Sequence, residues 1–334
     1  RSVSSLPEDV LGGKVIEKFG VMAPLVKILT PKGRLSVQFH DAKNELWIVT
    51  SCDNSLVEGG KNWIILGFSA ASVEKYGNKV TEHYGKALGV YGKTLNAMIS
   101  AIEACGQEKK DLLKETRDVL SAAEKVKSES PAVAGALKDF LKAKSDVEYF
   151  YSYRQVNAGD VIPVPSGTLH AMGPGVYVIE PQIAGPTQSL EDGTTYPVRY
   201  YFPGYQREDA VKRLDIDRVG EMRPEVTTDI RPETVEKGEG YIVDRLPGDF
   251  ADKGLEAHRI KFVTKAFIRR CNNDSMHSFS ATMGEAFVDF SGKSYAIPKA
   301  APGASMLIVP ASCGEYVLRA GTGAEIIDTF TPVS

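Results

Sequence analysis

Residues 158–170 read Ala158-Gly-Asp-Val-Ile-Pro-Val-Pro-Ser-Gly-Thr-Leu-His170, a short apolar run enclosed by glycine and proline. Short strands broken by tight turns at this frequency are typical of β-barrels and sandwiches. A weaker copy lies near the C-terminus and reads Pro302-Gly-Ala-Ser-Met-Leu-Ile-Val-Pro-Ala-Ser-Cys-Gly314. The repetition predicts two β-barrels of one kind, and the second copy lacks a histidine beside its turn.

The rest of the chain divides into regions of different periodicity. From residue 23 to 68, short apolar runs separated by Gly-containing turns predict closely connected strands. From residue 71 to 147, apolar residues at spacings of three and four predict a helical insertion, with one helix starting at Ser130-Pro131. We therefore predict a mainly β fold with a discontinuous first barrel at 1–70 and 148–213, a helical insertion at 71–147, a connection at 214–248 and a second barrel at 249–334.

Composition narrows the class of protein. The 334 residues are 43% hydrophobic and 25% charged, which is the mix of a soluble globular protein. A net charge of -3 without a dense Lys/Arg run argues against a nucleic-acid partner. No stretch approaches the roughly 20 apolar residues of a membrane helix and no apolar signal core follows Arg1, so we expect no membrane partner and a cytoplasmic protein. Because the chain begins at Arg1 rather than Met, we also expect native sequence to precede it.

Candidate metal ligands lie in three short segments. The four cysteines are too widely spaced for a zinc clip and are expected to be free thiols. In Leu35-Ser-Val-Gln-Phe-His40, period-two alternation places Gln38 and His40 on one face of a strand. A turn and a returning strand could bring Glu45 back beside His40, and His170 ends a short strand after a turn. Two imidazoles, a carboxylate and an amide oxygen suit Zn²⁺, although a single histidine on a strand is more often a core residue than a ligand.

Four motifs in order resemble the type I phosphomannose isomerase family. They are Pro24-Leu-Val-Lys-Ile-Leu29, Leu35-Ser-Val-Gln-Phe-His40, Lys43-Asn-Glu-Leu-Trp-Ile48 and Gly159-Asp-Val-Ile-Pro-Val-Pro-Ser-Gly-Thr-Leu-His-Ala171, with a helical insertion before the fourth. The resemblance covers most of the chain and is weaker after Arg199. It implies two cupin-type (jelly-roll) domains, the second metal-free, and a zinc-dependent interconversion of mannose 6-phosphate and fructose 6-phosphate through an enediolate.

The resemblance also assigns roles to residues. It implies one Zn²⁺ per chain held by Gln38, His40, Glu45 and His170. Lys43 and Glu180 are then the candidate general bases, and Arg199 a charged group at the rim of the active site. Ser36 and Lys27 are expected to contact the substrate or its phosphate.

This sequence departs from the family pattern beside the first histidine. Asp41 replaces the usual proline, Ala42 stands where some members have histidine, and the turn from His40 to Glu45 is short.

Other interpretations of the same pattern stay open. The main alternative is a non-catalytic cupin that senses a sugar phosphate, which the short turn and Ala42 allow. A metal oxygenase is a third possibility, because cupins host several chemistries and a fold does not fix a function. His83 is expected to be solvated, and His258 and His277 to be structural. The sequence does not decide between a monomer and a homodimer.

Overall fold

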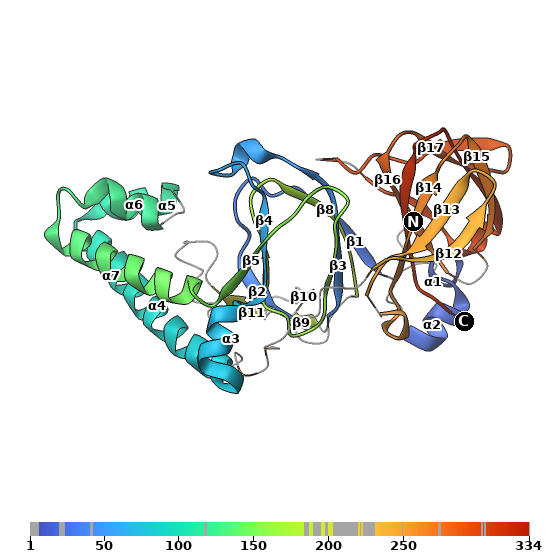
Figure 1. Cartoon of the computed structure of the whole chain (residues 1–334). Helices are drawn as coiled ribbons and strands as arrows, with labels where there is room; N and C mark the ends of the chain where they lie inside the picture. The colour runs from blue at the N-terminus through green and yellow to red at the C-terminus, as the bar shows by residue number, and fades with distance from the viewer. Residues whose placement is uncertain are drawn as a thin grey trace.

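The computed structural model describes residues 7–19, 24–40, 43–116, 119–183, 187–189, 195–197, 200–202, 220, 222, 231–248, 250–272, 275–301, 303 and 305–333. It is rich in antiparallel sheet, as predicted, and the strands form two β units that lie side by side (Figure 1). A group of helices projects from the first unit.

The first β unit consists of two antiparallel sheets. One sheet has the order β1-β8-β3-β6 and comprises β1 (Leu25–Leu29), β8 (Val176–Gln182), β3 (Glu45–Cys52) and β6 (Val161–Val164). The other has the order β11-β2-β7-β4-β5 and comprises β11 (Tyr200–Phe202), β2 (Val37–Phe39), β7 (His170–Met172), β4 (Trp63–Phe68) and β5 (Tyr151–Gln155). Apolar side chains of both sheets, including Trp47, Ile64 and Val178, form one buried cluster between them. The alternation in the sequence produces this cluster, because every second residue of a strand faces the same side.

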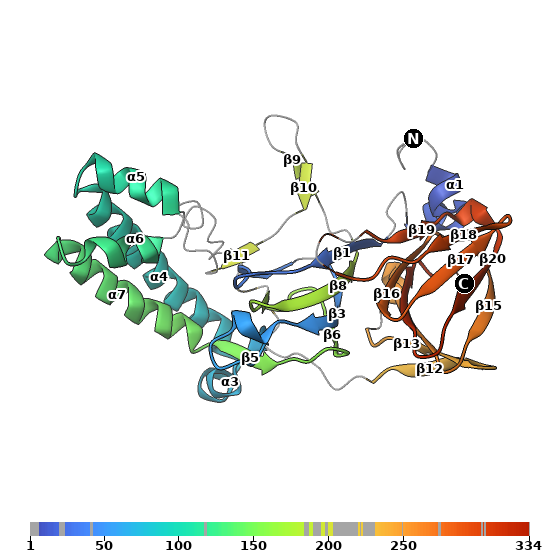
Figure 2. The same ribbon diagram turned by 90° about the horizontal axis from the view of Figure 1, so that it is seen from above.

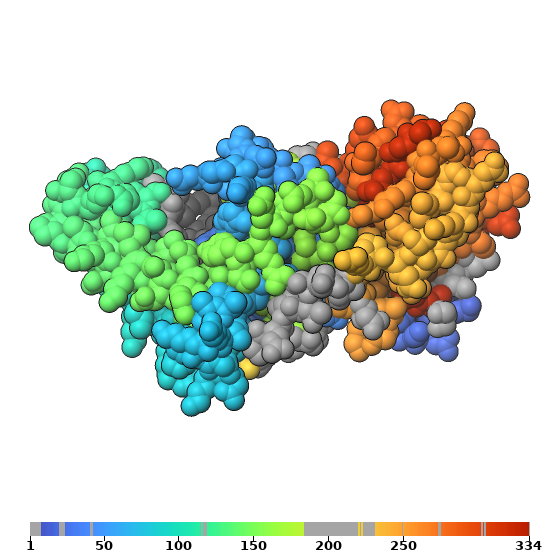
Figure 3. Space-filling view, viewed as in Figure 1, coloured from blue at the N-terminus to red at the C-terminus, as the bar shows by residue number. Residues whose placement is uncertain are grey.

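The helical insertion lies between β4 and β5, as the change of periodicity predicted. It contains α3 (Ala70–Tyr76), α4 (Val80–Glu103), α5 (Gln107–Thr116), α6 (Val119–Val126) and α7 (Pro131–Glu148). Ser130 caps α7, its hydroxyl accepting the Val133 N–H, and Pro131 occupies the first turn. The long helices α4 and α7 pack through Tyr91 and Phe140, and the insertion extends away from the second β unit (Figure 3).

The second β unit repeats the strand order of the first. One sheet has the order β12-β13-β14-β21-β16-β19 and comprises β12 (Glu233–Gly238), β13 (Tyr241–Arg245), β14 (Glu256–Phe262), β21 (Glu325–Phe330), β16 (His277–Met283) and β19 (Leu307–Val309). The other has the order β15-β20-β17-β18 and comprises β15 (Ala266–Cys271), β20 (Glu315–Ala320), β17 (Ala286–Phe290) and β18 (Lys293–Ala296). If β14 to β21 are counted as strands one to eight, both units have the orders one-eight-three-six and two-seven-four-five.

Shorter elements complete the described chain. They are the hairpin β9 (Thr187–Ser189) and β10 (Thr195–Pro197), the helices α1 (Pro7–Leu11) and α2 (Gly13–Phe19), and the 3₁₀ turns η2 (Asn54–Leu56), η3 (Gly77–Lys79), η5 (Ala251–Lys253) and η6 (Ala311–Cys313). The four cysteines are free, as expected. Among the described residues, no helix combines the length and apolar character needed to cross a bilayer.

Two segments belong to a different part of the fold than the sequence predicted. The predicted connection at 214–248 contains β12 and β13, which extend the sheet of the second unit through pairing with β14. The N-terminal helices lie against the second unit, because Leu11 and Val15 pack on Met276 (Figure 2). Both differences come from pairing and packing between distant segments, which local periodicity does not encode.

The two units share an apolar boundary. Leu46, Ile48 and Ile179 of the first unit cluster with Ala257 and Ile327 of the second. Nη2 of Arg259 also donates a hydrogen bond of 2.8 Å to the carbonyl oxygen of Gly159. The inner strands of the first unit are therefore supported from outside by the second.

Candidate metal centre

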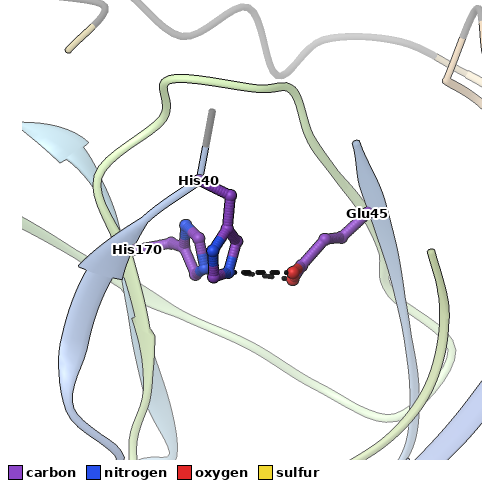
Figure 4. A group of neighbouring side chains, drawn as sticks. All are labelled: His40, Glu45 and His170. Atoms are coloured by element: carbon purple, nitrogen blue, oxygen red, sulfur yellow. Dashed lines mark ion pairs between the residues drawn. The ribbon is translucent and has the colours of Figure 1, made fainter. Parts of the chain in front are cut away.

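Three strand ends bring His40, Glu45 and His170 together. His40 directly follows β2, Glu45 begins β3 and His170 begins β7. Figure 4 shows the two imidazoles pointing toward the Glu45 carboxylate. Nε2 of His40 lies 3.1 Å from Oε1 of Glu45, and Nε2 of His170 lies 3.9 Å from Oε2. One potential ligand atom from each residue lies within 4.8 Å of the others, as binding to a single ion requires.

Burial keeps the His40 imidazole in the form that binds metals. His40 is 2% exposed, and burial lowers its pKa to about 3, so it is neutral at physiological pH. Nδ1 of His170 lies 2.7 Å from the carbonyl oxygen of Thr168, which can only accept a hydrogen bond. Nδ1 of His170 therefore carries a proton, and Nε2 is the nitrogen that faces Glu45.

Gln38 supplies a fourth potential ligand. It lies directly opposite His170 where β2 pairs with β7. Its Oε1 atom is buried and has no hydrogen-bond partner among the described residues. A buried amide oxygen without a partner is unfavourable, and coordination of a cation would satisfy it. Two imidazoles, one carboxylate and this oxygen are a donor set that fits Zn²⁺.

Lys43 lies against the carboxylate of the cluster. Its ammonium group contacts Oε1 of Glu45, and the lysine is only 3% exposed. Burial lowers the pKa of Lys43, against the opposing charges of Glu45 and Glu180. For Glu45, burial favours the neutral acid, but the contact with His40 and the charges of His170 and Lys43 outweigh it and hold the pKa well below its usual range. Glu45 is therefore a carboxylate, the form that binds a cation.

A second buried carboxylate faces the same interior. Glu180 is 4% exposed and pairs with Lys27 across β1 and β8. Nζ of Lys27 donates to Oε1 of Glu180 at 3.0 Å and to Oε1 of Gln182 at 2.7 Å. Burial and the charge of Glu45 raise the pKa of Glu180 to about 7, although Lys27 and Lys43 lower it. This carboxyl group can thus change its protonation state near neutral pH.

The structure thus gathers most of the residues singled out in the sequence. His40, Glu45 and His170 converge. Gln38 is paired with His170 across β2 and β7, and Lys43 contacts Glu45. Glu180 and Lys27 form a separate pair that interacts electrostatically with this cluster.

The remaining residues singled out in the sequence lie elsewhere or outside the described residues. Ser36 is half-buried just before β2, without a described hydrogen bond to the cluster. Arg199 lies outside the described residues, as do Asp41 and Ala42.

Three contributors to the site escaped the sequence analysis. Nε1 of Trp47 donates to Oε2 of Glu45 at 3.0 Å, and Gln182 accepts from Lys27. Asn44 accepts the Ser166 N–H at 2.8 Å and so ties the turn before His170 to the start of β3. Only Trp47 carried a local signal, because it follows Glu45 by two residues and must share its face of the strand.

Comparison with known proteins finds solved structures of similar fold. No protein-family model matches the chain, and no curated protein matches it. A crystal structure of mannose 6-phosphate isomerase from Bacillus subtilis aligns with a TM-score of 0.52 and 16% identity, covering 98% of this chain and 80% of that one. A variant of phosphomannose isomerase from Salmonella typhimurium aligns with a TM-score of 0.56 and 15% identity, covering 98% and 84%.

A zinc-bound mannose 6-phosphate isomerase aligns similarly, with a TM-score of 0.55 and 14% identity over 98% and 84% of the two chains. At these identities the likeness shows a shared fold. The proteins that share it are type I phosphomannose isomerases, the family that the sequence resembles.

Proposed function

We propose that this chain is a zinc-dependent aldose-ketose isomerase that interconverts mannose 6-phosphate and fructose 6-phosphate. The observation that carries the proposal is the buried convergence of His40, Glu45 and His170 in a fold shared with zinc-bound isomerases. We further propose that each β unit is a cupin-type jelly roll, supported by the strand order common to both. The enzyme would work in the cytoplasm.

In this proposal one zinc ion is held by Gln38, His40, Glu45 and His170. When bound, such an ion supplies Lewis acidity toward sugar oxygens that become negatively charged in an enediolate. The hydrogen bond from His170 Nδ1 to the Thr168 carbonyl oxygen orients one ligand, and Lys43 and Trp47 hold the carboxylate of another.

Glu180 is the general base in this mechanism. Isomerisation requires a proton to leave C2 of the open-chain sugar and return at C1, and a base with a pKa near the working pH transfers it best. The pKa of Glu180, raised to about 7 by burial and by Glu45, meets this condition. Oε1 of Glu180 already accepts a hydrogen bond from Lys27, so we assign Oε2 as the oxygen that accepts the sugar proton.

The remaining lysine and the phosphate contacts complete the assignment. Lys43, with a pKa lowered by burial, would donate a hydrogen bond toward charge developing on the sugar. Ser36 would bind the phosphate, as the family resemblance implies, and Arg199 would lie at the rim. Lys27 is paired with Glu180 and Gln182, which supports a role in holding the base rather than the phosphate.

A coupled assay of mannose 6-phosphate isomerisation tests the proposal. The purified chain is stripped with a chelator, then assayed with mannose 6-phosphate, free mannose and glucose 6-phosphate, with and without added zinc. We expect turnover of mannose 6-phosphate only after zinc is restored. Full activity that survives complete removal of metal would refute the mechanism.

One observation favours the non-catalytic alternative, a sugar-phosphate sensor. Both candidate bases are already paired, Lys43 with Glu45 and Glu180 with Lys27. A sensor would bind mannose 6-phosphate without exchanging the C2 proton with solvent. Deuterium incorporation at C2 in heavy water, followed by NMR, separates the two functions.

A further inference from the structure

Trp47 lies beneath the candidate metal centre. It is the third residue of β3 and is 2% exposed. Its Nε1–H donates to Oε2 of Glu45 at 3.0 Å, and its ring meets His170 edge-on, with centroids 5.4 Å apart and planes at 78°. One indole side chain therefore contacts two of the proposed zinc ligands.

The hydrogen bond completes the restraint of the Glu45 carboxylate. Oε1 is held by Lys43 and lies 3.1 Å from Nε2 of His40, while Oε2 is held by Trp47. A carboxylate with both oxygens engaged cannot rotate freely about its last bond. Groups that orient a ligand in this way raise metal affinity, because less order has to be imposed when the ion binds.

The second β unit provides an internal comparison for the indole N–H. Glu45 begins β3 and His277 begins β16, the third strand of each unit. Two residues later the first unit has Trp47 and the second has Phe279. Phe279 packs edge-on against Tyr316, at 6.2 Å and 69°, much as Trp47 packs against His170. Both units thus have an aromatic ring at this position. The ring carries an N–H group in the first unit, where the Glu45 carboxylate lies two residues earlier, and none in the second.

We infer that Trp47 is a positioning residue of the metal centre, which acts through its hydrogen bond to Glu45. The inference rests on the metal site of the proposed function but not on the isomerase reaction. Packing alone would require only the ring, as Phe279 illustrates. The N–H contributes separately, by fixing a ligand before the ion arrives.

Replacing Trp47 with Phe keeps the ring and removes the donor. Zinc affinity of the full chain is measured by competition with a chromophoric chelator, which does not depend on turnover. We expect Trp47→Phe to weaken zinc binding by about 10–100-fold, the usual cost of losing a group that orients a metal ligand. Unchanged affinity would overturn the inference, as would a wild-type chain that binds no zinc.

Trp63→Phe is the matched control. Trp63 and Trp47 are the two tryptophans of the chain, and the ring of Trp63 packs edge-on against Tyr153, away from the ligands. This variant should bind zinc as the wild type does. It leaves Trp47 as the sole indole, so its fluorescence should change on titration with zinc; an unresponsive emission would count against the contact.

A double-mutant cycle with Glu45→Ala separates positioning from folding. If Trp47 acts through Glu45, Trp47→Phe should change the already weakened zinc affinity of the Glu45→Ala background by less than about twofold, measured by titration at high zinc concentration. An equal loss in both backgrounds, accompanied by earlier thermal unfolding of the metal-free chain, would show a packing role and refute the inference. Wild-type protein that binds zinc but does not isomerise would refute only the proposed reaction.

Discussion

The two β units have the same strand order but use the same positions differently. In the first unit Glu45 faces Gln182 across the third and eighth strands, and in the second His277 faces Phe330. Lys27 faces Glu180 across the first and eighth strands, where the second unit has His258 and Asp328. A scaffold therefore fixes where side chains meet, and residue type decides what they do there.

Two pairs of polar side chains lie at the corresponding place in the second unit. Nδ1 of His277 lies 2.9 Å from Oδ1 of Asp328, and the Tyr316 hydroxyl donates to Oδ1 of Asn272 at 3.0 Å. The Phe330 ring stacks on His277 with centroids 4.7 Å apart. Within the described part of the chain, a cluster of three potential metal ligands of the His, Cys, Asp or Glu type occurs in the first unit alone. We infer that the first unit binds metal and the second supports it.

The largest expected effect is the loss of zinc, which should follow a change in the first unit but not a change in the second. His170→Ala removes a ligand, so we expect loss of stoichiometric zinc and a fall in kcat/KM on the order of 10²–10³-fold or more. His277→Ala, at the mouth of the second unit, should lower the thermal unfolding temperature but leave zinc content unchanged. Atomic absorption on both variants checks this, and loss of zinc from the His277 variant would break the comparison.

The next effect concerns Glu180 and Asp328, the buried carboxylates at equivalent positions of the two units. Glu180 must be ionised to accept a proton, so with a pKa of about 7 the rate should rise with pH through neutrality. Glu180→Gln should lower kcat by about 10²-fold with zinc retained. Asp328→Asn should keep both the rate and its rising pH limb. Steady-state kinetics from pH 5 to 9 tests the pair, and a fully active Glu180→Gln variant would exclude this base.

The smallest effect concerns the lysine paired with the base. Because the charge of Lys27 lowers the pKa of Glu180, Lys27→Met should move the rising pH limb upward by about one unit. Lys261→Met removes a comparable pair with Asp244 in the second unit and should leave the profile in place. A midpoint that does not move in the Lys27 variant would show that the pair does not set the protonation of the base.

Local sequence pattern anticipates those parts of the site that lie close together in the chain. Alternation placed Gln38 and His40 on one face, and the short turn predicted the return of Glu45 to His40. The helical insertion followed from spacings of three and four, and the repeat at 158–170 and 302–314 corresponds to β6–β7 and β19–β20, which occupy equivalent places in the two units.

The pairing of strands that are distant in the chain could not be predicted from local sequence pattern. Lys27 meets Glu180 only because β1 pairs with β8, 153 residues away. The same holds for β12 and β13 in the predicted connection and for Leu11 and Val15 against Met276. Periodicity reports which face a side chain takes, but it does not report which strand or helix that face will meet.

Anomalous diffraction at the zinc edge, on crystals of the zinc-loaded chain, locates the metal without reference to activity. We predict one strong peak in the first β unit, within bonding distance of His40, Glu45 and His170, and no peak between His277 and Asp328. A peak in the second unit alone, or none in the first, would contradict the assignment of the metal centre.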